Sequence, residues 1–468
     1  MNLWILTEER PKENVIQFII DKFKNDKKVD ISYDSLKIVP VLDKKSFDHT
    51  FTYLVKGFTS KSINQIILKI VSGDSSFVDF LVFHQEKEPI QSDIPIFAIE
   101  ETKTDDSESR NTGVYQRASK FVYIDYYYPN IDKTMLYNLK ITQKKDPTAT
   151  SIFGSRCLRT LGVKFIGKRF DERTDEPWKN IDDLIKSKDK MKGTKNGTSI
   201  KIIKVSDKKI TISGKLQKLA KKKQEDGSVK TSYNWSDPSI GTLTLIASTL
   251  RKLGWSGEIE ITKHELIQKQ LNTANKFTLI ANKLNITLTG PTLLKQTMPP
   301  LYWHYEDKSE KLGSIFLHNT ILFSRLGDAI FENHAGSEKG YFITSKNEYL
   351  SLDKKTTDKK PIAIPDLILI DPKRNEIINV EAKQYSTRRN GVEELNGYDE
   401  IENLYIKKHY PGYKVIRTVV LYGDDKEEVD DVHISFLLNK NGRLVLATNA
   451  PSLMHDAIKH LKDYWENN

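Results

Sequence analysis

The sequence predicts an α/β protein made of two similar cores, each a mixed central sheet flanked by helices, joined by a basic and mainly helical middle region. Three features lead to this prediction. A pair of short apolar runs that ends in acidic residues and a lysine occurs twice. Apolar residues at helical spacing precede and follow each pair. A lysine-rich segment separates the two copies, which places the predicted domains at residues 1–185, 186–300 and 301–468.

The composition is typical of a globular protein from a reducing compartment. Of the 468 residues, 38% are hydrophobic and 29% are charged. No apolar run is long enough to span a membrane and no signal peptide is recognisable, so we expect a cytoplasmic protein without a membrane partner. Cys157 is the single cysteine, which excludes an internal disulfide and a cysteine-based zinc site. The formal net charge of +10 favours an anionic partner.

The first copy opens with an amphipathic helix, predicted over residues 12–25 from its apolar spacing. Two strands are predicted next, at residues 78–83 and 94–103. Asp79 opens the first of these strands, and a Glu-Thr-Lys sequence closes the second. The chain thus offers a carboxylate at the start of one strand and further charged groups at the end of its neighbour.

Alternation along the second strand decides which of its charged residues belong together. Glu101 and Lys103 point to one face, whereas Glu100 points to the opposite face. The choice between the two glutamates is therefore a question of strand register. We expect Asp79, Glu101 and Lys103 to form a first candidate site, with Asp79 and Glu101 as metal ligands.

The middle region begins with a strong local excess of positive charge. Residues 186–230 contain 15 lysines and four acidic residues. This segment suits contact with a phosphate backbone, and a solvated flexible linker is the alternative. Helices are predicted at 237–253, from a capping box at 262–265 onward, and at 276–284. Three short helices with tight turns form either a helix-turn-helix reader or plain helical packing.

The second copy contains the stretch that best predicts chemistry, PDLILIDPKRNEIINVEAK at residues 365–383. Two apolar runs joined by a polar turn predict a buried hairpin. Asp366 opens its first strand, and Glu381 and Lys383 end the second on one shared face. Because adjacent strands lie about 4.8 Å apart, the two carboxylates can converge. The alternative is a surface hairpin with solvated carboxylates.

Two converging carboxylates favour a hard divalent cation, Mg²⁺ in particular. We expect Asp366 and Glu381 to hold the ion with the Ala382 carbonyl as a third ligand, and Lys383 to position or deprotonate an attacking water. These groups suit hydrolysis of a phosphodiester. No Gly-x-x-x-x-Gly-Lys-Ser/Thr loop accompanies them, so the sequence does not predict a P-loop ATPase.

The segments that follow the two candidate sites resemble each other. Both run from Arg-Asn and Gly-Val through a helical segment to Tyr-Pro, ending at Pro129 and Pro411. Further strands are predicted at 133–141 and 413–421. We interpret the repeat as an internal duplication, and a chance echo of short motifs is the alternative. Strands at 432–438 and 444–448 and a helix at 452–464 are predicted to complete the second core.

At Pro365, Asp366, Glu381, Ala382 and Lys383 the chain resembles the PD-(D/E)XK nuclease superfamily. The resemblance implies restriction-endonuclease-like cores and Mg²⁺-dependent cleavage of DNA. In that family a helix before the strands often carries another acidic residue that faces the metal. For the helix predicted at residues 314–333, Glu332 and Asp328 are the candidates for that role.

The resemblance leads us to expect a type II restriction endonuclease that hydrolyses double-stranded DNA, with a companion DNA methyltransferase encoded elsewhere. Each core would cut one strand, or the first core would act as a recognition or effector module. A repair or structure-specific nuclease is an alternative enzyme, and a non-catalytic DNA-binding protein on a decayed nuclease fold is an alternative of another class. The sequence leaves open whether the protein is a monomer or a homodimer.

Overall fold

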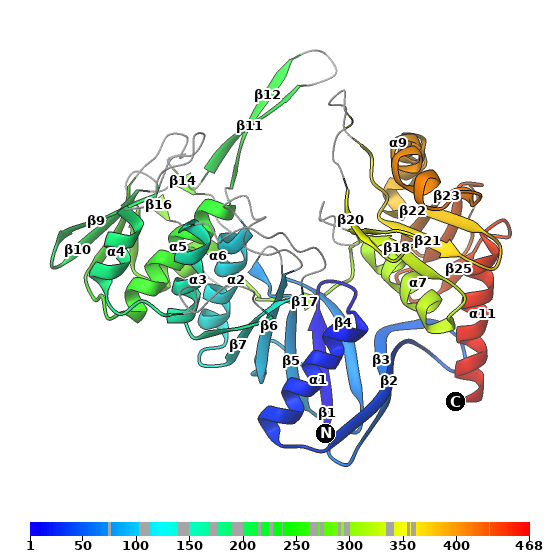
Figure 1. Cartoon of the computed structure of the whole chain (residues 1–468), viewed down its shortest axis with the longest axis horizontal. Helices are drawn as coiled ribbons and strands as arrows, with labels where there is room; N and C mark the ends of the chain where they lie inside the picture. The colour runs from blue at the N-terminus through cyan, green and yellow to red at the C-terminus, as the bar shows by residue number, and fades with distance from the viewer. Residues whose placement is uncertain are drawn as a thin grey trace. The chain divides into compact units, whose positions relative to one another are not determined.

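The structure is a computed structural model of an α/β protein with several mixed sheets flanked by helices (Figure 1). The residues that it describes are 1–73, 76–102, 113–138, 149–167, 176–189, 200–213, 217–223, 228–235, 237–262, 270–271, 276–288, 292–293, 300–333, 341–352, 356, 362–429 and 431–468.

The chain forms two compact units that interleave along the sequence. Unit 1 comprises residues 1–72, 82–89 and 305–468, and unit 2 comprises residues 73–81 and 90–304. The boundary predicted after residue 300 lies close to the last change of unit, whereas the boundary predicted after residue 185 lies inside unit 2.

The first part of unit 1 is a sheet with strand order β2-β3-β4-β1-β5, in which β1 and β4 are parallel and β2 and β3 form a long antiparallel pair. The predicted opening helix is confirmed as α1, and its apolar stripe is buried. The elements are β1 (Asn2–Thr7), α1 (Glu13–Lys27), β2 (Ile31–Leu42), β3 (His49–Ser60), β4 (Ile66–Ser72) and β5 (Phe80–Gln85), with β5 divided between the two units.

The second part of unit 1 is a mixed sheet with strand order β18-β21-β22-β23-β24-β25. The predicted hairpin is confirmed as the antiparallel pair β21–β22, and β23 runs parallel to β22. The elements of this part are α7 (Lys311–Ser324), β18 (Asp328–Glu332), β19 (Tyr341–Ile343), β20 (Tyr349–Ser351), β21 (Leu367–Asp371), β22 (Glu376–Gln384), η3 (Tyr385–Thr387), α8 (Arg388–Glu394), η4 (Leu395–Gly397), α9 (Asp399–Ile401), the π-helix η5 (Glu402–Ile406), α10 (Lys407–His409), β23 (Lys414–Tyr422), β24 (Ile434–Leu438), β25 (Leu444–Leu446) and α11 (Ser452–Asn467).

The helix predicted over residues 314–333 is only partly correct. Helix α7 ends at Ser324, where Arg325 adopts a left-handed conformation with φ 58°. Residues Asp328–Glu332 then form β18, which pairs antiparallel with β21. Pairing with a buried neighbouring strand stabilises these residues more than another turn of helix would. Tertiary contacts therefore override the helical spacing of the apolar residues.

Helix α7 lies close against the parallel strands and positions them. A Cβ on Gly313 would stand 2.6 Å from the backbone oxygen of Leu421 on β23, so only glycine permits this approach. Helix α11 packs against α7, and its Trp465 Nε1 donates a hydrogen bond of 2.8 Å to the Pro40 carbonyl on β2. The C-terminal helix thereby ties the two sheets of unit 1 together.

Two groups of parallel strands in unit 2 have related connectivity. In one, the parallel strands β6, β7 and β8 are linked by helices α2 and α3. In the other, the parallel strands β10, β13 and β15 are linked by α5 and α6, and β9 pairs antiparallel with β10. Helix α2 packs against α5 within the unit (Figure 1).

The elements of unit 2 are β6 (Phe97–Thr102), α2 (Gly113–Tyr127), β7 (Asp132–Tyr137), α3 (Ala149–Thr160), β8 (Val163–Ile166), α4 (Ile181–Asp189), β9 (Lys201–Ser206), β10 (Lys209–Ser213), β11 (Gln217–Lys223), β12 (Val229–Trp235), α5 (Asp237–Lys252), β13 (Glu258–Thr262), β14 (Gln270–Leu271), α6 (Lys276–Lys283), β15 (Ile286–Leu288) and β16 (Thr292–Leu293). Strand β17 (His304–Tyr305) crosses from unit 2 into unit 1.

The prediction of a mainly helical middle region is wrong. Strand β13 follows α5, and the unit contains more strands than helices between residues 200 and 293. The second of the three predicted helices falls mainly on residues 263–269, outside the described part of the chain, so the helix-turn-helix reader stays a prediction. Ile259 and Ile261 alternate with glutamates and are buried, which is the pattern of a half-buried strand. The capping box reaches into β13 with Thr262, and its remaining residues lie outside the described part of the chain.

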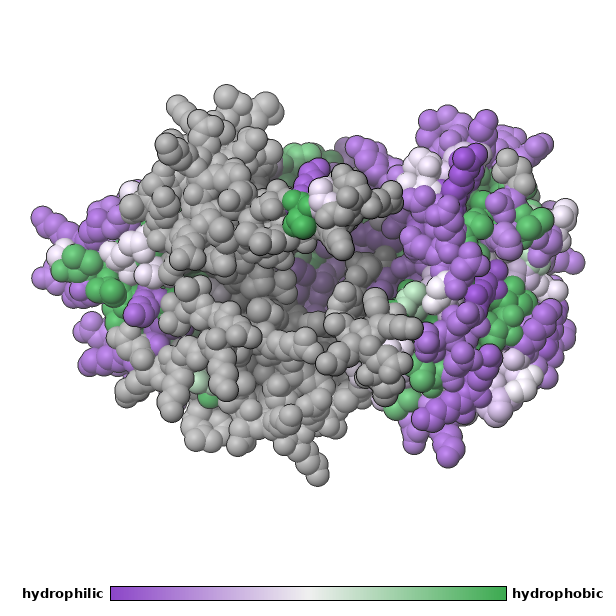
Figure 2. Space-filling model, turned by 90° about the horizontal axis from the view of Figure 1, so that it is seen from above, coloured by the Kyte–Doolittle hydropathy of each residue, from purple (hydrophilic) through white to green (hydrophobic). Residues whose placement is uncertain are grey.

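The described surface seen in Figure 2 is mostly hydrophilic, with apolar side chains in smaller separate groups. None of the helices that the structure describes is long and apolar enough to cross a membrane.

Candidate active site

The hairpin β21–β22 brings the predicted carboxylates of the second copy to one strand end. Leu367 pairs with Val380, so Asp366 and Glu381 come next on the two strands. Asp366 Oδ2 accepts a hydrogen bond of 2.9 Å from the backbone N–H of Ala382. This bond fixes the Asp366 carboxylate against the strand that carries the glutamate. We call Asp366, Glu381 and Lys383 the second site.

Lys383 and Glu381 lie on the same side of β22, as the alternation predicts. The Lys383 ammonium is paired with Glu381 and, at 2.9 Å, with Glu394 Oε2 on helix α8. The hydroxyl of buried Tyr398 donates a hydrogen bond to the other oxygen of Glu381. The side chain of Glu381 is 6% exposed and that of Lys383 is 15% exposed, so both charges act with little screening by solvent.

Sequence reasoning missed three residues of the helical segment that cover this site. Glu394 and Tyr398 hold the lysine and the glutamate, and Gly391 gives the lysine its room. A Cβ on Gly391 would stand 2.7 Å from Lys383 Cγ, so a larger residue would displace the stem of the lysine. The repeated Gly-Val pair in the sequence was the available signal for Gly391.

Burial and like charge alter the acidity of the two carboxyl groups. Burial, together with the charges of Glu310 and Glu394, raises the pKa of Asp366 to about 6 against the opposing effect of the Ala382 N–H. Burial and the nearby Asp366 likewise raise the pKa of Glu381 to about 8. Burial lowers the pKa of Lys383, but its contacts with Glu381 and Glu394 outweigh burial, so its pKa is raised overall. The lysine is therefore a cation and a donor in this state.

We expect the free energy of unfolding to fall as the pH rises from 5 to 8 in EDTA. Carboxyl groups of the unfolded chain titrate at about pH 4, whereas Asp366 and Glu381 keep their protons to higher pH. The folded protein then binds more protons than the unfolded chain, so stability declines with pH, by about 2 kcal/mol or more. Urea unfolding at each pH measures this decline. Glu381→Gln should flatten it, while Glu376→Gln at the far end of β22 should not; equal slopes in all three proteins would contradict the assignment.

The donor set of the second site fits Mg²⁺. Two buried carboxylates at one strand end repel each other, and a divalent cation relieves that repulsion. Mg²⁺ commonly takes one or two carboxylates and keeps several waters. Within the described ranges no three His, Cys, Asp or Glu side chains gather as a ready metal site. A two-carboxylate site that leaves room for waters agrees with this, and the Ala382 carbonyl as a third ligand stays a prediction.

The structure places Glu332 and Asp328 outside the second site. Asp328 pairs with Ile370, at the end of β21 opposite to Asp366. Glu332 Oε2 lies 2.8 Å from Arg10 Nε and 3.3 Å from His318 Nδ1, and Lys12 Nζ lies 2.7 Å from its other oxygen. Burial raises the pKa of Glu332, but these basic neighbours outweigh burial and hold it well below its usual range. Glu332 is thus committed to an ion-pair cluster.

Glu310 is an acidic residue that the sequence analysis did not consider. It stands at the N-terminal cap of α7, and its charge is among the causes that raise the pKa of Asp366. The sequence prediction missed it because the helix was placed three residues too late and extended too far toward its C-terminus.

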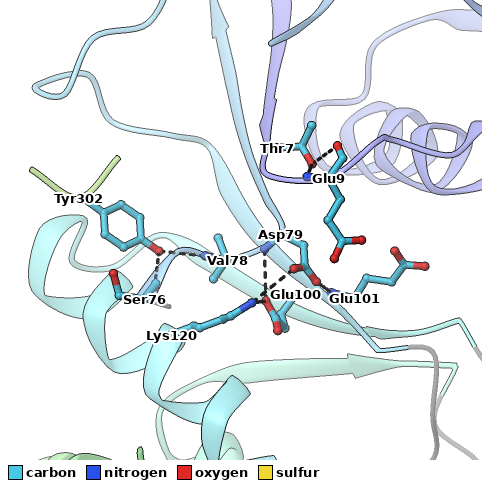
Figure 3. A network of polar contacts seen from close by, with 9 residues as sticks. All are labelled: Thr7, Glu9, Ser76, Val78, Asp79, Glu100, Glu101, Lys120 and Tyr302. Atoms are coloured by element: carbon cyan, nitrogen blue, oxygen red, sulfur yellow. Dashed lines mark hydrogen bonds and ion pairs between the residues drawn. The ribbon is translucent and has the colours of Figure 1, made fainter. Parts of the chain in front are cut away.

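The first copy also brings acidic residues together at a strand end, but the residues involved differ from those predicted (Figure 3). Asp79 immediately precedes β5, and Glu101 N donates a hydrogen bond of 2.6 Å to Asp79 Oδ2. Lys120 of helix α2 lies 2.9 Å from Glu100 Oε2 and 3.4 Å from Asp79 Oδ1. We call Asp79, Glu100 and Lys120 the first site.

The prediction that Glu101 shares this site with Asp79 is wrong. Its carboxylate accepts a hydrogen bond of 2.7 Å from Asn138 Nδ2, which follows β7, whereas Glu100 Oε2 accepts the backbone N–H of Asp79 at 3.2 Å. The register of β6 therefore places Glu100 on the side of Asp79. Lys103 lies outside the described residues.

A buried tyrosine holds the backbone that leads to Asp79. The Tyr302 hydroxyl accepts a hydrogen bond of 3.2 Å from Val78 N and donates one of 3.2 Å to Ser76 O (Figure 3). Tyr302 is fully buried. Because its hydroxyl forms hydrogen bonds with two backbone groups just before the aspartate, it fixes the backbone conformation that orients the Asp79 side chain.

No protein-family model, curated protein or solved structure matches this chain. Both sites combine an aspartate at a strand start, a glutamate on the neighbouring strand and a lysine ion-paired to the glutamate. They differ in the element that carries the lysine.

Proposed function

We propose that the protein is a Mg²⁺-dependent endonuclease of the type II restriction class, which hydrolyses phosphodiesters of double-stranded DNA at the second site. The observation that carries the proposal is the convergence of Asp366, Glu381 and Lys383 at one end of a hairpin inside a mixed sheet. In this proposal the two sheets with acidic strand ends are restriction-endonuclease-like cores.

The residues of the second site divide the work of hydrolysis. Asp366 and Glu381 would hold Mg²⁺, which when bound supplies Lewis-acid activation of the water and charge neutralisation at the phosphate. Lys383 is held beside them as a cation, so it donates hydrogen bonds to the phosphate and orients the water. It does not act as the base, because its contacts with two carboxylates keep its proton bound.

The overall reaction consumes one water for each ester bond. The water oxygen forms a bond to phosphorus, and one P–O ester bond breaks. One proton of the water ends on the released hydroxyl, and the other remains with the new phosphate monoester until it ionises to solvent. Glu394 and Tyr398 keep Lys383 and Glu381 in place during this exchange.

A local excess of positive charge in the sequence would assist binding of such a substrate. The excess of lysine in residues 186–230 supports contact with phosphates of the DNA backbone, which release counterions on binding. Partners in this proposal are double-stranded DNA and, in function, a methyltransferase that protects the host sites. A repair or structure-specific nuclease would use the same chemistry but leave no fixed set of fragments.

Digestion of phage DNA and supercoiled plasmid tests the proposal. We expect discrete fragments in Mg²⁺, none in EDTA, and loss of the fragment pattern in Asp366→Asn, because that carboxylate would no longer hold the ion. Agarose gels of time courses give the measurement. The control must not disturb the hairpin turn, which Asp371 caps by accepting hydrogen bonds from the backbone N–H groups of Lys373 and Arg374. Glu376→Gln, at the opposite end of β22 from Glu381, is the control variant and should digest DNA as the wild type does.

Cleavage without fixed fragments would favour the repair or structure-specific nuclease. Retained DNA binding by a wild type that cuts no DNA in Mg²⁺ would overturn the nuclease and leave the DNA-binding protein on a decayed fold. Salt-dependent gel shifts on the same DNA distinguish this case from a protein that binds no DNA at all.

A further inference from the structure

The hydrogen bonds of the two aspartates define which strand positions correspond. At the second site Asp366 Oδ2 accepts the N–H of the residue that follows Glu381. At the first site Asp79 Oδ2 accepts the N–H of the residue that follows Glu100. Glu100 therefore occupies the position of Glu381, by backbone geometry and without reference to side-chain type.

The same correspondence shows that the strand of the first site has no lysine in the equivalent place. Two residues beyond Glu381 the strand carries Lys383, but two residues beyond Glu100 it carries Thr102, which is 1% exposed. A buried threonine cannot donate a positive charge to a phosphate. If the first site has a cation, another element must supply it.

Helix α2 supplies that cation. Lys120 Nζ lies 2.9 Å from Glu100 Oε2 and 3.4 Å from Asp79 Oδ1, so it faces both carboxylates at once (Figure 3). Its side chain is 18% exposed, close to the exposure of Lys383. The ammonium is thus in contact with the two acidic groups and accessible from solvent.

The surroundings hold this trio in a fixed arrangement. Glu100 is 2% exposed, and its carboxylate also caps the backbone N–H of Asp79. The neighbouring Glu101 carboxylate is turned away to Asn138, and Tyr302 fixes the backbone before Asp79. Two carboxylates and a lysine held in this way are the same functional groups that form the second site. In the first site the lysine comes from a helix and not from the strand that carries the glutamate.

We propose that Asp79, Glu100 and Lys120 form a second phosphodiester-hydrolysing centre in which Lys120 on helix α2 is the catalytic lysine. The inference rests on the proposed function. Each turnover here again joins a water oxygen to phosphorus, breaks one P–O ester bond and leaves one proton on the released hydroxyl. Asp79 and Glu100 would hold Mg²⁺, and Lys120 would donate hydrogen bonds to the phosphate.

The test uses full-length protein with Asp366→Ala, which disables the second site. This protein should still nick supercoiled plasmid in Mg²⁺. Adding Lys120→Met should lower the nicking rate at least about 100-fold. Adding Lys164→Met, a 60% exposed lysine on β8, should leave the rate unchanged. Lys120→Arg preserves the charge near both carboxylates and keeps the test open should the methionine variant fail to fold.

Mg²⁺ affinity gives a readout besides activity. In the Asp366→Ala background, thermal unfolding at increasing Mg²⁺ should show tighter binding for Lys120→Met, about threefold or more, because a neighbouring ammonium repels the cation. Glu100→Gln should weaken binding at least about tenfold. A lysine with a merely structural role would not lower the nicking rate while raising metal affinity.

The outcomes separate the inference from the function on which it rests. No cleavage by the wild type overturns the nuclease and this centre with it. Normal digestion by the wild type together with no nicking by Asp366→Ala overturns only the proposed centre at the first site. Nicking that survives Lys120→Met but is lost in Lys103→Met overturns Lys120 as the catalytic lysine.

Discussion

Lys383→Met is expected to lower the rate of phosphodiester cleavage at the second site by about 10²- to 10³-fold, with DNA affinity within about threefold of the wild type. In the proposed mechanism the ammonium donates hydrogen bonds to the phosphate, and Glu381 and Glu394 hold it in place. Methionine keeps the length of the stem in the space beside Gly391 but removes the charge. Loss of transition-state stabilisation therefore exceeds loss of binding.

The measurement is single-turnover cleavage of a labelled duplex that contains the target, once discrete digestion has identified one. Lys373→Met is the matched control, because Lys373 is exposed in the turn of the same hairpin. Unchanged cleavage by Lys383→Met would remove the lysine from the mechanism. A parallel loss of binding and cleavage would assign it to ground-state contact with DNA instead.

Arg417→Met is expected to destabilise the protein by about 3 kcal/mol, because it leaves a buried carboxylate without its cation. Arg417 Nε lies 2.7 Å from Glu402 Oε1, and Asn379 Nδ2 donates a hydrogen bond of 2.8 Å to the same oxygen. Glu402 is 6% exposed. It begins the π-helix η5, a short distance after Tyr398, so the loss should also loosen the residue that holds Glu381.

Urea unfolding in EDTA measures this effect. Lys414→Met on the same strand is the matched control, since that lysine is 73% exposed and its ion pair should contribute less than about 0.5 kcal/mol. Combining Arg417→Met with Glu402→Gln should recover more than half of the loss, because the amide no longer needs a cation. A double variant as unstable as Arg417→Met would show that the loss of stability comes from lost packing of the arginine and not from the unpaired charge of Glu402.

The hairpin that carries the second site was predicted from the sequence because its determinants are local. Alternation along a strand, a polar turn and two apolar runs place Asp366 opposite Glu381 and put Lys383 on the same face. Each of these features depends on residues within one hairpin. The opening helix and the last strands of the second sheet were predicted for the same reason.

The first site could not be settled in this way. Glu100 and Glu101 are adjacent and equally acidic, and the choice between them depends on which side of β6 faces Asp79. The prediction chose Glu101 because Lys103 follows it at the right spacing. The structure places Glu100 with Lys120, a lysine 20 residues farther along the chain on a helix.

By itself, then, the sequence determined the α/β class, the two acidic strand ends and the hairpin that carries the second site. Only the tertiary structure decided that β13 separates α5 from α6, that Glu332 pairs with Arg10, and that Tyr398 and Lys120 reach the two glutamates. Strand alternation is a property of the backbone and repeats every two residues. Contacts between a helix and a strand depend on how elements pack, and the free energy of that packing comes from side chains distant in the sequence.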